Sequence, residues 1–108
     1  MKFLVIIEAV PPMLMPPEQA LALCKEDMAW LRRAKESGRA EVQYCFADHA
    51  GGLMGGCGIA NYESAEQLAE DLATCPAAGV STFKVYPLVA PEVVEKMIEA
   101  WEAQLAKK

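Results

Sequence analysis

The chain has 108 residues and a formal net charge of -5 at pH 7. This length suits a single domain, so we expect one core across residues 1–108 and no internal linker. The acidic balance and the lack of a lysine or arginine cluster exclude the nonspecific binding to nucleic acid or anionic lipid that a basic patch supports. Apolar residues form 54% of the sequence and charged residues 23%, a balance that favours a self-associating domain.

The start of the chain predicts neither a membrane span nor a secretory signal. Its first apolar run, FLVII at residues 3–7, meets Glu8 and is too short for either kind of segment. We therefore expect a cytoplasmic protein with no membrane partner.

The hydrophobic pattern predicts four strands and three helices. Residues 2–10 are rich in β-branched side chains, as strands are. Pro16 and Pro17 suit a helix start, and Leu21, Cys24, Met28 and Leu31 then recur at helical spacing. Ser64 and Gln67 form a capping box that begins a second helix. Strands are predicted over residues 2–10, 41–49, 53–62 and 80–89, and helices over residues 17–38, 63–75 and 91–107.

This β-α-β-β-α-β order, followed by a C-terminal helix, is the ferredoxin-like split βαβ pattern of the α+β class. Its two helices cover one face of an antiparallel sheet, yet the first strand is apolar on both faces. A second copy of the sheet would cover the other face, so we expect a homodimer that forms a dimeric α/β barrel, or a larger homo-oligomer. The helix over residues 91–107 has a stripe of apolar residues, and we expect it to pack at a subunit interface.

Residues 41–62 read as a hairpin that turns at Gly51 and Gly52. If the hairpin closes symmetrically about Gly51, Cys45 faces Cys57 across the two strands. His49 would then lie about 13 Å from Cys45 along its strand, too far to share a zinc ion. We expect free thiols and no metal site, because none of the four cysteines forms a C-x-x-C pair.

Two features of this hairpin have more than one interpretation. The only histidine, His49, is either an exposed residue at a loop edge or a general acid or base at the mouth of a cavity. The glycines of the third strand, Gly55, Gly56 and Gly58, either form a bulge or leave space for a ligand. Their spacing matches no phosphate-binding loop.

Glu8 is an acid near the end of an otherwise apolar strand. Burial would raise its pKa and make it a usable base, whereas exposure at the strand end would make it ordinary. Lys84 and Tyr86 alternate on one face of the last strand, where they would either bind a substrate carboxylate or oxyanion or face solvent. Tyr44 and Cys57 are further candidate substrate-binding residues on the central hairpin.

Several segments resemble the muconolactone delta-isomerase family. They are KFLVIIEAV with the PPMLMPPEQ that follows closely after it, the helix end ESGR, and ANYESAEQLAEDLATCPAAGVSTFKVYPLV. The resemblance covers most of residues 1–90 and implies a small dimeric α/β barrel of the ferredoxin-like type. It also implies a cofactor-free proton shift, in which a base removes a proton next to a lactone carbonyl. Glu8 falls where that family has an acid, so it is the preferred base, with His49 as a second catalytic candidate.

The second strand departs from the family pattern. It reads AEVQYCFADH and lacks the arginine that suits an anionic lactone acid, although Lys84 or Arg39 could substitute. The sequence therefore predicts an isomerase-like enzyme for a hydrophobic, lactone-type small molecule. Two alternatives stay open, because fold alone does not choose among functions. They are a noncatalytic ligand-binding or structural oligomer, and a cofactor-free oxygenase.

Overall fold

The structure is a computed structural model that describes residues 1–9, 16–47 and 53–107. Its elements follow the predicted order. They are β1 (Lys2–Ala9), α1 (Pro17–Glu36), β2 (Ala40–Ala47), β3 (Leu53–Asn61), α2 (Ala65–Leu72), a short 3-10 turn (Ala78–Val80), β4 (Ser81–Leu88) and α3 (Pro91–Ala106). Proline stands at the start of both α1 and α3. The predicted capping box is confirmed, because the Ser64 hydroxyl accepts the Gln67 N–H at 3.1 Å.

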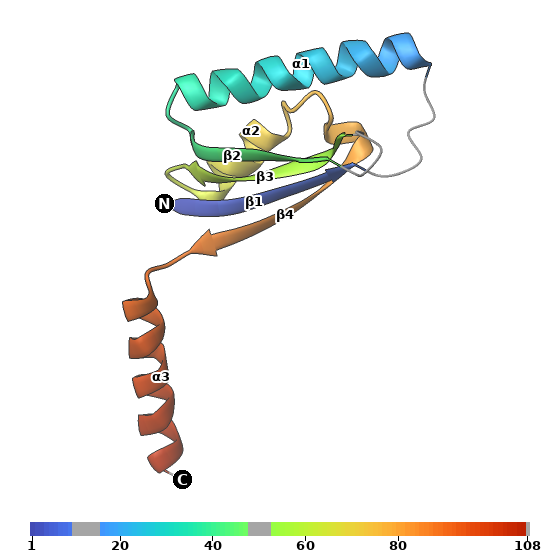
Figure 1. Cartoon of the computed structure of the whole chain (residues 1–108). Helices are drawn as coiled ribbons and strands as arrows, with labels where there is room; N and C mark the ends of the chain where they lie inside the picture. Colours follow the sequence, from blue (N-terminus) through green and yellow to red (C-terminus); the bar gives the residue numbers. More distant parts are fainter. Residues whose placement is uncertain (10–15, 48–52, 108) are drawn as a thin grey trace.

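The four strands form one antiparallel sheet in the order β2-β3-β1-β4. Figure 1 shows α1 and α2 on the same side of this sheet. The ferredoxin-like α+β fold predicted from the sequence is therefore confirmed.

The core lies between α2 and the two central strands. Phe3, Val5, Tyr62 and Leu68 are buried together there. Since side chains alternate along a strand, the even-numbered residues of β1 face away from the helices. We call that uncovered surface of the sheet the open face. It carries Leu4, Ile6 and Glu8 of β1 and the residues paired with them on the other strands.

The apolar stripe predicted on α1 is partly wrong. Leu21 and Met28 are 57% and 40% exposed. The more buried positions form a stripe turned toward Trp30 and Ala34, the two buried residues of the helix. They are Ala20, Leu23, Cys24, Asp27, Ala29, Trp30, Leu31 and Ala34. The large apolar residues Leu21 and Met28 lie beside the buried stripe. The stripe predicted from the sequence was therefore centred about one residue away from the buried one.

The predicted pairing of Cys45 with Cys57 is also wrong. Tyr44 pairs with Cys57 and Cys45 pairs with Gly56, so the two cysteines lie on opposite faces of the sheet. The register shifts near the end of the hairpin, between Phe46 and Ala47, and this irregularity breaks the symmetry on which the prediction relied. The predicted turn at residues 51–52 lies outside the described residues.

α3 stands apart from the rest of the chain. Figure 1 shows it leading away from the end of β4, on the side of the sheet opposite α1. The radius of gyration is 18.0 Å, whereas a compact domain of this length has about 13 Å. None of the helices in the described part of the chain joins enough length with enough apolar character to cross a membrane.

Candidate functional site

A cavity of about 410 Å³ lies between α1 and the sheet. We call it the α1 cavity. This volume falls in the range of small-molecule sites, which bury a ligand against mostly apolar walls with a few polar groups. Its apolar walls come from α1, from the helix-facing side of β1 and from the segment before β4. Leu23, Trp30, Leu31, Val5, Ile7 and Val80 are among them.

The glycines of β3 form the floor of the α1 cavity and are also required by the backbone. A Cβ atom at Gly58 would lie 2.4 Å from the Val42 carbonyl oxygen of the neighbouring strand. Gly55 has φ +134°, and a Cβ there would lie 2.0 Å from the Ile7 carbonyl oxygen. Glycines 55, 56 and 58 line the cavity and also allow the strands to approach closely. That this space holds a ligand stays a prediction.

Asp27 brings a carboxylate into these apolar surroundings. It is half-buried on the inward stripe of α1 and lines the α1 cavity. Among the cavity-lining residues that the structure describes, it is the one carboxylic acid. Asp27 was not among the site residues predicted from the sequence. The signal that could have found it is its spacing of three and four residues from Cys24, Trp30 and Leu31.

The thiol of Cys75 forms a hydrogen bond to this carboxylate. Its Sγ atom donates a hydrogen bond to Oδ1 of Asp27 at 3.2 Å. Cys75 is 5% exposed, and burial together with this hydrogen bond raises the pKa of its thiol to about 12. The group is therefore a protonated donor at neutral pH. The other three cysteines, also free, are less buried than Cys75.

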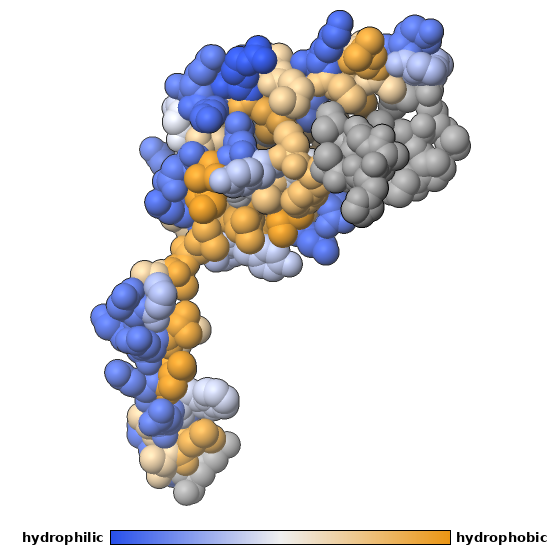
Figure 2. Space-filling view, viewed as in Figure 1, coloured by the Kyte–Doolittle hydropathy of each residue, from blue (hydrophilic) through white to orange (hydrophobic). Residues whose placement is uncertain are grey.

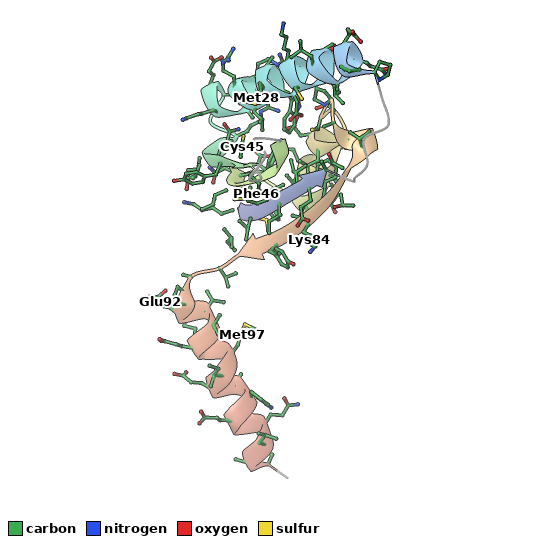
Figure 3. All side chains as sticks on the ribbon, turned by 45° about the vertical axis from the view of Figure 1, so that its right-hand side comes forward. Met28, Cys45, Phe46, Lys84, Glu92 and Met97 are labelled. Carbon is green, nitrogen blue, oxygen red and sulfur yellow. The ribbon has the colours of Figure 1, made fainter. Side chains whose placement is uncertain are left out.

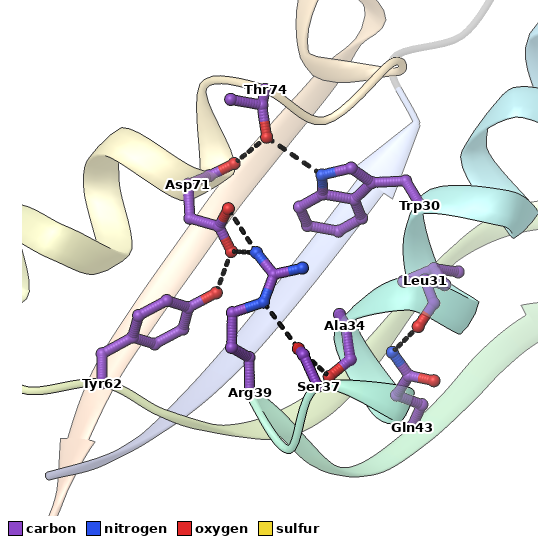
Figure 4. Close-up of polar contacts among 9 residues, drawn as sticks. All are labelled: Trp30, Leu31, Ala34, Ser37, Arg39, Gln43, Tyr62, Asp71 and Thr74. Atoms are coloured by element: carbon purple, nitrogen blue, oxygen red, sulfur yellow. Dashed lines mark hydrogen bonds and ion pairs between the residues drawn. The ribbon is translucent and has the colours of Figure 1, made fainter.

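A second polar group lies where Arg39 follows α1 (Figure 4). Nη1 of Arg39 is 2.5 Å from both carboxylate oxygens of Asp71, and Nε donates to Ser37 Oγ at 2.8 Å. The Tyr62 hydroxyl also donates to Asp71. Burial, with the adjacent Asp71 carboxylate, raises the Tyr62 pKa above its ordinary value. Arg39 and Tyr62 line both the α1 cavity and a more open pocket beside it.

Trp30 and Gln43 link α1 to the other walls of the α1 cavity. The indole N–H of Trp30 donates to the Thr74 hydroxyl at 3.0 Å, which ties α1 to the segment after α2. Gln43 ties α1 to β2, because its side-chain N–H donates to the Leu31 carbonyl oxygen at 2.9 Å. The walls of the cavity are thus held by directional bonds as well as by apolar contact.

The open face gathers most of the site residues named from the sequence. Lys84 and Cys57 pair with Ile6, Tyr86 pairs with Leu4, and Tyr44 pairs with Cys57, so all of them share the face of Glu8. Figure 3 shows Lys84 projecting from β4 away from α1.

Glu8 itself is exposed near the end of β1 and does not line the α1 cavity. Tyr44 and Cys57 also contribute atoms to the cavity wall. His49 lies outside the described residues. In residues 1–9, 16–47 and 53–107, no three histidine, cysteine, aspartate or glutamate side chains are grouped to hold a metal ion.

No protein-family model and no curated protein matches the sequence. Solved structures do match the fold. The crystal structure of muconolactone isomerase at 3.3 Å resolution superposes with a TM-score of 0.72 and 21% identity, covering 83% of this chain and 90% of that one. The chain has the fold of muconolactone isomerase.

The fold recurs in 5-chloro-2-hydroxyhydroquinone dehydrochlorinase from Burkholderia phenoliruptrix AC1100, solved in complex with 2,5-dihydroxybenzoquinone. It superposes with a TM-score of 0.66 and 18% identity, covering 82% of this chain and 94% of that one. At these identities the likeness to muconolactone isomerase and to the dehydrochlorinase establishes the fold, and the chemistry of this chain has to come from its own side chains.

Proposed function

We propose that the protein is a cofactor-free enzyme that moves a proton within a small hydrophobic ring compound of the lactone type. The observation that carries the proposal is the α1 cavity, a mostly apolar space of about 410 Å³ whose lining includes the carboxylic acid Asp27 and the guanidinium residue Arg39. A proton shift next to a carbonyl needs a base and a group that stabilises the developing oxyanion. Side chains alone can supply both.

Arg39 supports this proposal as the cation that the second strand lacks. Both Arg39 and Lys84 were candidates for that role, and only Arg39 lines the α1 cavity. Nη1 and Nε of Arg39 are occupied by Asp71 and Ser37, while Nη2 has no hydrogen-bond partner among the residues that the structure describes. That nitrogen is available to a carbonyl or carboxylate oxygen of the substrate.

The open face offers a competing site for the same reaction. There Glu8 would be the base, with Lys84, Tyr86, Tyr44 and Cys57 as substrate-binding residues and His49 as a second catalytic candidate. We place the substrate in the α1 cavity because a single chain already forms its walls, whereas Lys84 and Tyr86 of the open face are exposed in the single chain, Tyr86 to 50%. The open face becomes enclosed only when another chain covers it.

We propose that a second copy of the chain covers the open face and that α3 takes part in this homodimer. The open face presents exposed aromatic residues, Tyr44 at 68% and Tyr86 at 50%. Figure 2 shows an apolar stripe along α3 as well. Its largest exposed residues are Val93, Val94, Met97, Ile98, Trp101 and Leu105. An isolated domain rarely leaves so much apolar surface in water, and two copies can bury both surfaces at once.

The free thiols fit the cytoplasmic location that the sequence predicts.

Binding and proton exchange together test the proposed function. A panel of unsaturated lactones in D₂O is followed by NMR for deuterium uptake next to the carbonyl, and binding is followed by the fluorescence of Trp30 in a W101F background. Cys24→Phe fills the α1 cavity, while Leu21→Phe places the same aromatic side chain on the outer side of α1. We expect Cys24→Phe to lose at least about tenfold in affinity, and Leu21→Phe to bind as the wild type does.

Glu8→Gln and Lys84→Ala test the competing site. With the substrate in the α1 cavity, both variants keep the wild-type affinity and exchange rate. If they lose both properties while Cys24→Phe retains them, the substrate lies on the open face. A wild type that binds lactones without exchanging protons identifies a noncatalytic ligand-binding protein.

A further inference from the structure

We propose that Asp27 is the residue that removes and returns the proton, and that the Cys75 thiol positions it. The inference rests on the proposed function and adds a catalytic residue, a positioning residue and a substrate class to it. The location of Asp27 supports this role. Asp27 is the one carboxylate among the described residues of the cavity wall, and it stands amid Leu23, Trp30 and Leu31 on the inward stripe of α1.

The hydrogen bond from Cys75 holds one oxygen of the Asp27 carboxylate. Because Sγ donates to Oδ1 at 3.2 Å, that oxygen is held in place by a neutral donor. Oδ2 has no hydrogen-bond partner in residues 1–9, 16–47 and 53–107, so it is available to a substrate C–H. A carboxylate that is held through one oxygen in the wall of an apolar cavity has the placement required of a general base.

The group that donates the hydrogen bond to Asp27 is neutral, and this matters for its strength as a base. A lysine or arginine behind Asp27 would add a full positive charge and weaken the carboxylate as a base, since an opposite charge favours the ionised form. The Cys75 thiol is held in its neutral form by burial. It therefore orients the carboxylate without neutralising it.

These contacts define a balanced proton shift. The Asp27 carboxylate takes a proton from an sp³ carbon next to a carbonyl, and the C–H electron pair moves into an enolate whose charge lies on the carbonyl oxygen. Arg39, which lines the same cavity together with Arg32 and Lys35, is the cation that we assign to that oxygen. The carboxylic acid formed at Asp27 then gives its proton to the far carbon of the conjugated enolate. The C=C bond has moved, Asp27 is a carboxylate again, and no co-reactant is consumed.

The substrate class follows from this chemistry. It is a ring lactone or enone with an unsaturated bond one carbon beyond the acidic C–H, small enough for about 410 Å³ and flat enough to lie on the glycines of β3. A flat ring suits that floor because Gly56 and Gly58 present backbone and no side chains.

Asp27→Asn tests the base, with Glu26→Gln on the exposed side of the same helix as the matched control. The lactone panel is used with two readouts, the deuterium exchange rate and the affinity from Trp30 fluorescence in the W101F background. We expect Asp27→Asn to slow exchange by at least about a hundredfold while its affinity stays within about twofold. Glu26→Gln should match the wild type in both. Asp27→Ala should regain exchange when formate is added, because formate can occupy the space of the missing carboxylate.

Cys75 variants test the positioning role. Cys75→Ala should lower the exchange rate by about tenfold at unchanged affinity, and Cys75→Ser should restore it because a hydroxyl also donates. Equal exchange by Asp27→Asn and the wild type overturns the inference and leaves the proposed function standing. So does an Asp27→Ala protein that formate does not rescue. A wild type that neither binds nor exchanges any lactone overturns both.

Discussion

The Sγ atom of Cys75 lies 3.2 Å from Oδ1 of Asp27 and donates a hydrogen bond to it. The two residues are 48 positions apart in the chain. This bond joins the segment after α2 to the middle of α1, across the wall of the α1 cavity. Its donor is a thiol whose pKa is raised to about 12. The reaction rate and the titration of the Cys75 thiol therefore test whether this hydrogen bond is formed.

Cys75 should be the slowest of the four thiols to react. Alkylation requires the thiolate, and at pH 8 a group with a pKa of about 12 supplies almost none. Cys45 is exposed and should react first. Iodoacetamide labelling followed by peptide mass spectrometry gives the order, and the protein in guanidinium, where all four thiols are exposed, is the control. Labelling of native Cys75 as rapid as that of Cys45 would contradict the buried hydrogen bond.

The same thiol gives the folding free energy a pH dependence of known sign. The folded pKa of Cys75, about 12, lies above the ordinary value of 9.0. The folded state therefore favours the protonated thiol, and its stabilising contribution is complete below pH 9 and is lost as the pH rises toward 12. Urea unfolding at several pH values should show the wild type losing stability in this range faster than Cys75→Ser. Parallel curves for the two proteins would show that the thiol does not titrate in this way.

The fold and the site differ in how far the sequence could predict them. Strand alternation, the prolines at residues 17 and 91 and the capping box are local signals, and all of them gave the correct elements. The pairing of Cys45 depended on the register of a whole hairpin, which a single irregularity shifts by one residue. The prediction of Asp27 depended on which side of α1 faces the sheet, and that side is set by tertiary packing against β2 and the segment after α2, which helical spacing alone does not specify.

The Asp71 carboxylate should stabilise the fold and raise the pKa of Tyr62. Asp71 accepts hydrogen bonds from Arg39 and Tyr62, and its side chain is 19% exposed. Asp71→Asn should cost about 1–3 kcal/mol of unfolding free energy, because it leaves a partly buried guanidinium without its counter-charge. Tyr62→Phe keeps the ion pair and should cost less. An equal loss in both variants would place the stabilisation in the tyrosine bond.

Tyrosine absorbance gives an independent measurement of this cluster. In an alkaline titration, one of the three tyrosines of the chain should ionise last in the wild type. Asp71→Asn should lower the pKa of that tyrosine, since the variant removes the negative charge beside its hydroxyl. A titration curve that Asp71→Asn leaves unchanged would show that burial alone sets the Tyr62 pKa.

Trp101 should hold the proposed homodimer together through α3. It is 63% exposed in a single chain, and Met97, one turn away, is also 63% exposed. Trp101→Glu places a charge in the proposed interface and should convert the dimer to a monomer in size-exclusion chromatography with light scattering. Glu99→Gln, also on the exposed surface of α3, is the control and should stay dimeric. A dimer that survives Trp101→Glu would mean that α3 is not in the interface.

Gly58 and Gly79 form a matched pair that tests the floor of the α1 cavity. A Cβ at Gly58 would lie 2.4 Å from the Val42 carbonyl oxygen, while a Cβ at Gly79 would meet nothing within 4 Å. Gly58→Ala must therefore push β3 away from β2 and should lose about 1–3 kcal/mol of unfolding free energy. Gly79→Ala should change stability by less than about 0.5 kcal/mol. Because the obstructing atom belongs to the backbone, no side chain can move aside to accommodate the methyl group. Urea denaturation of the two variants measures the difference in unfolding free energy. Equal stabilities would show that a methyl group at Gly58 does not clash with the Val42 carbonyl oxygen.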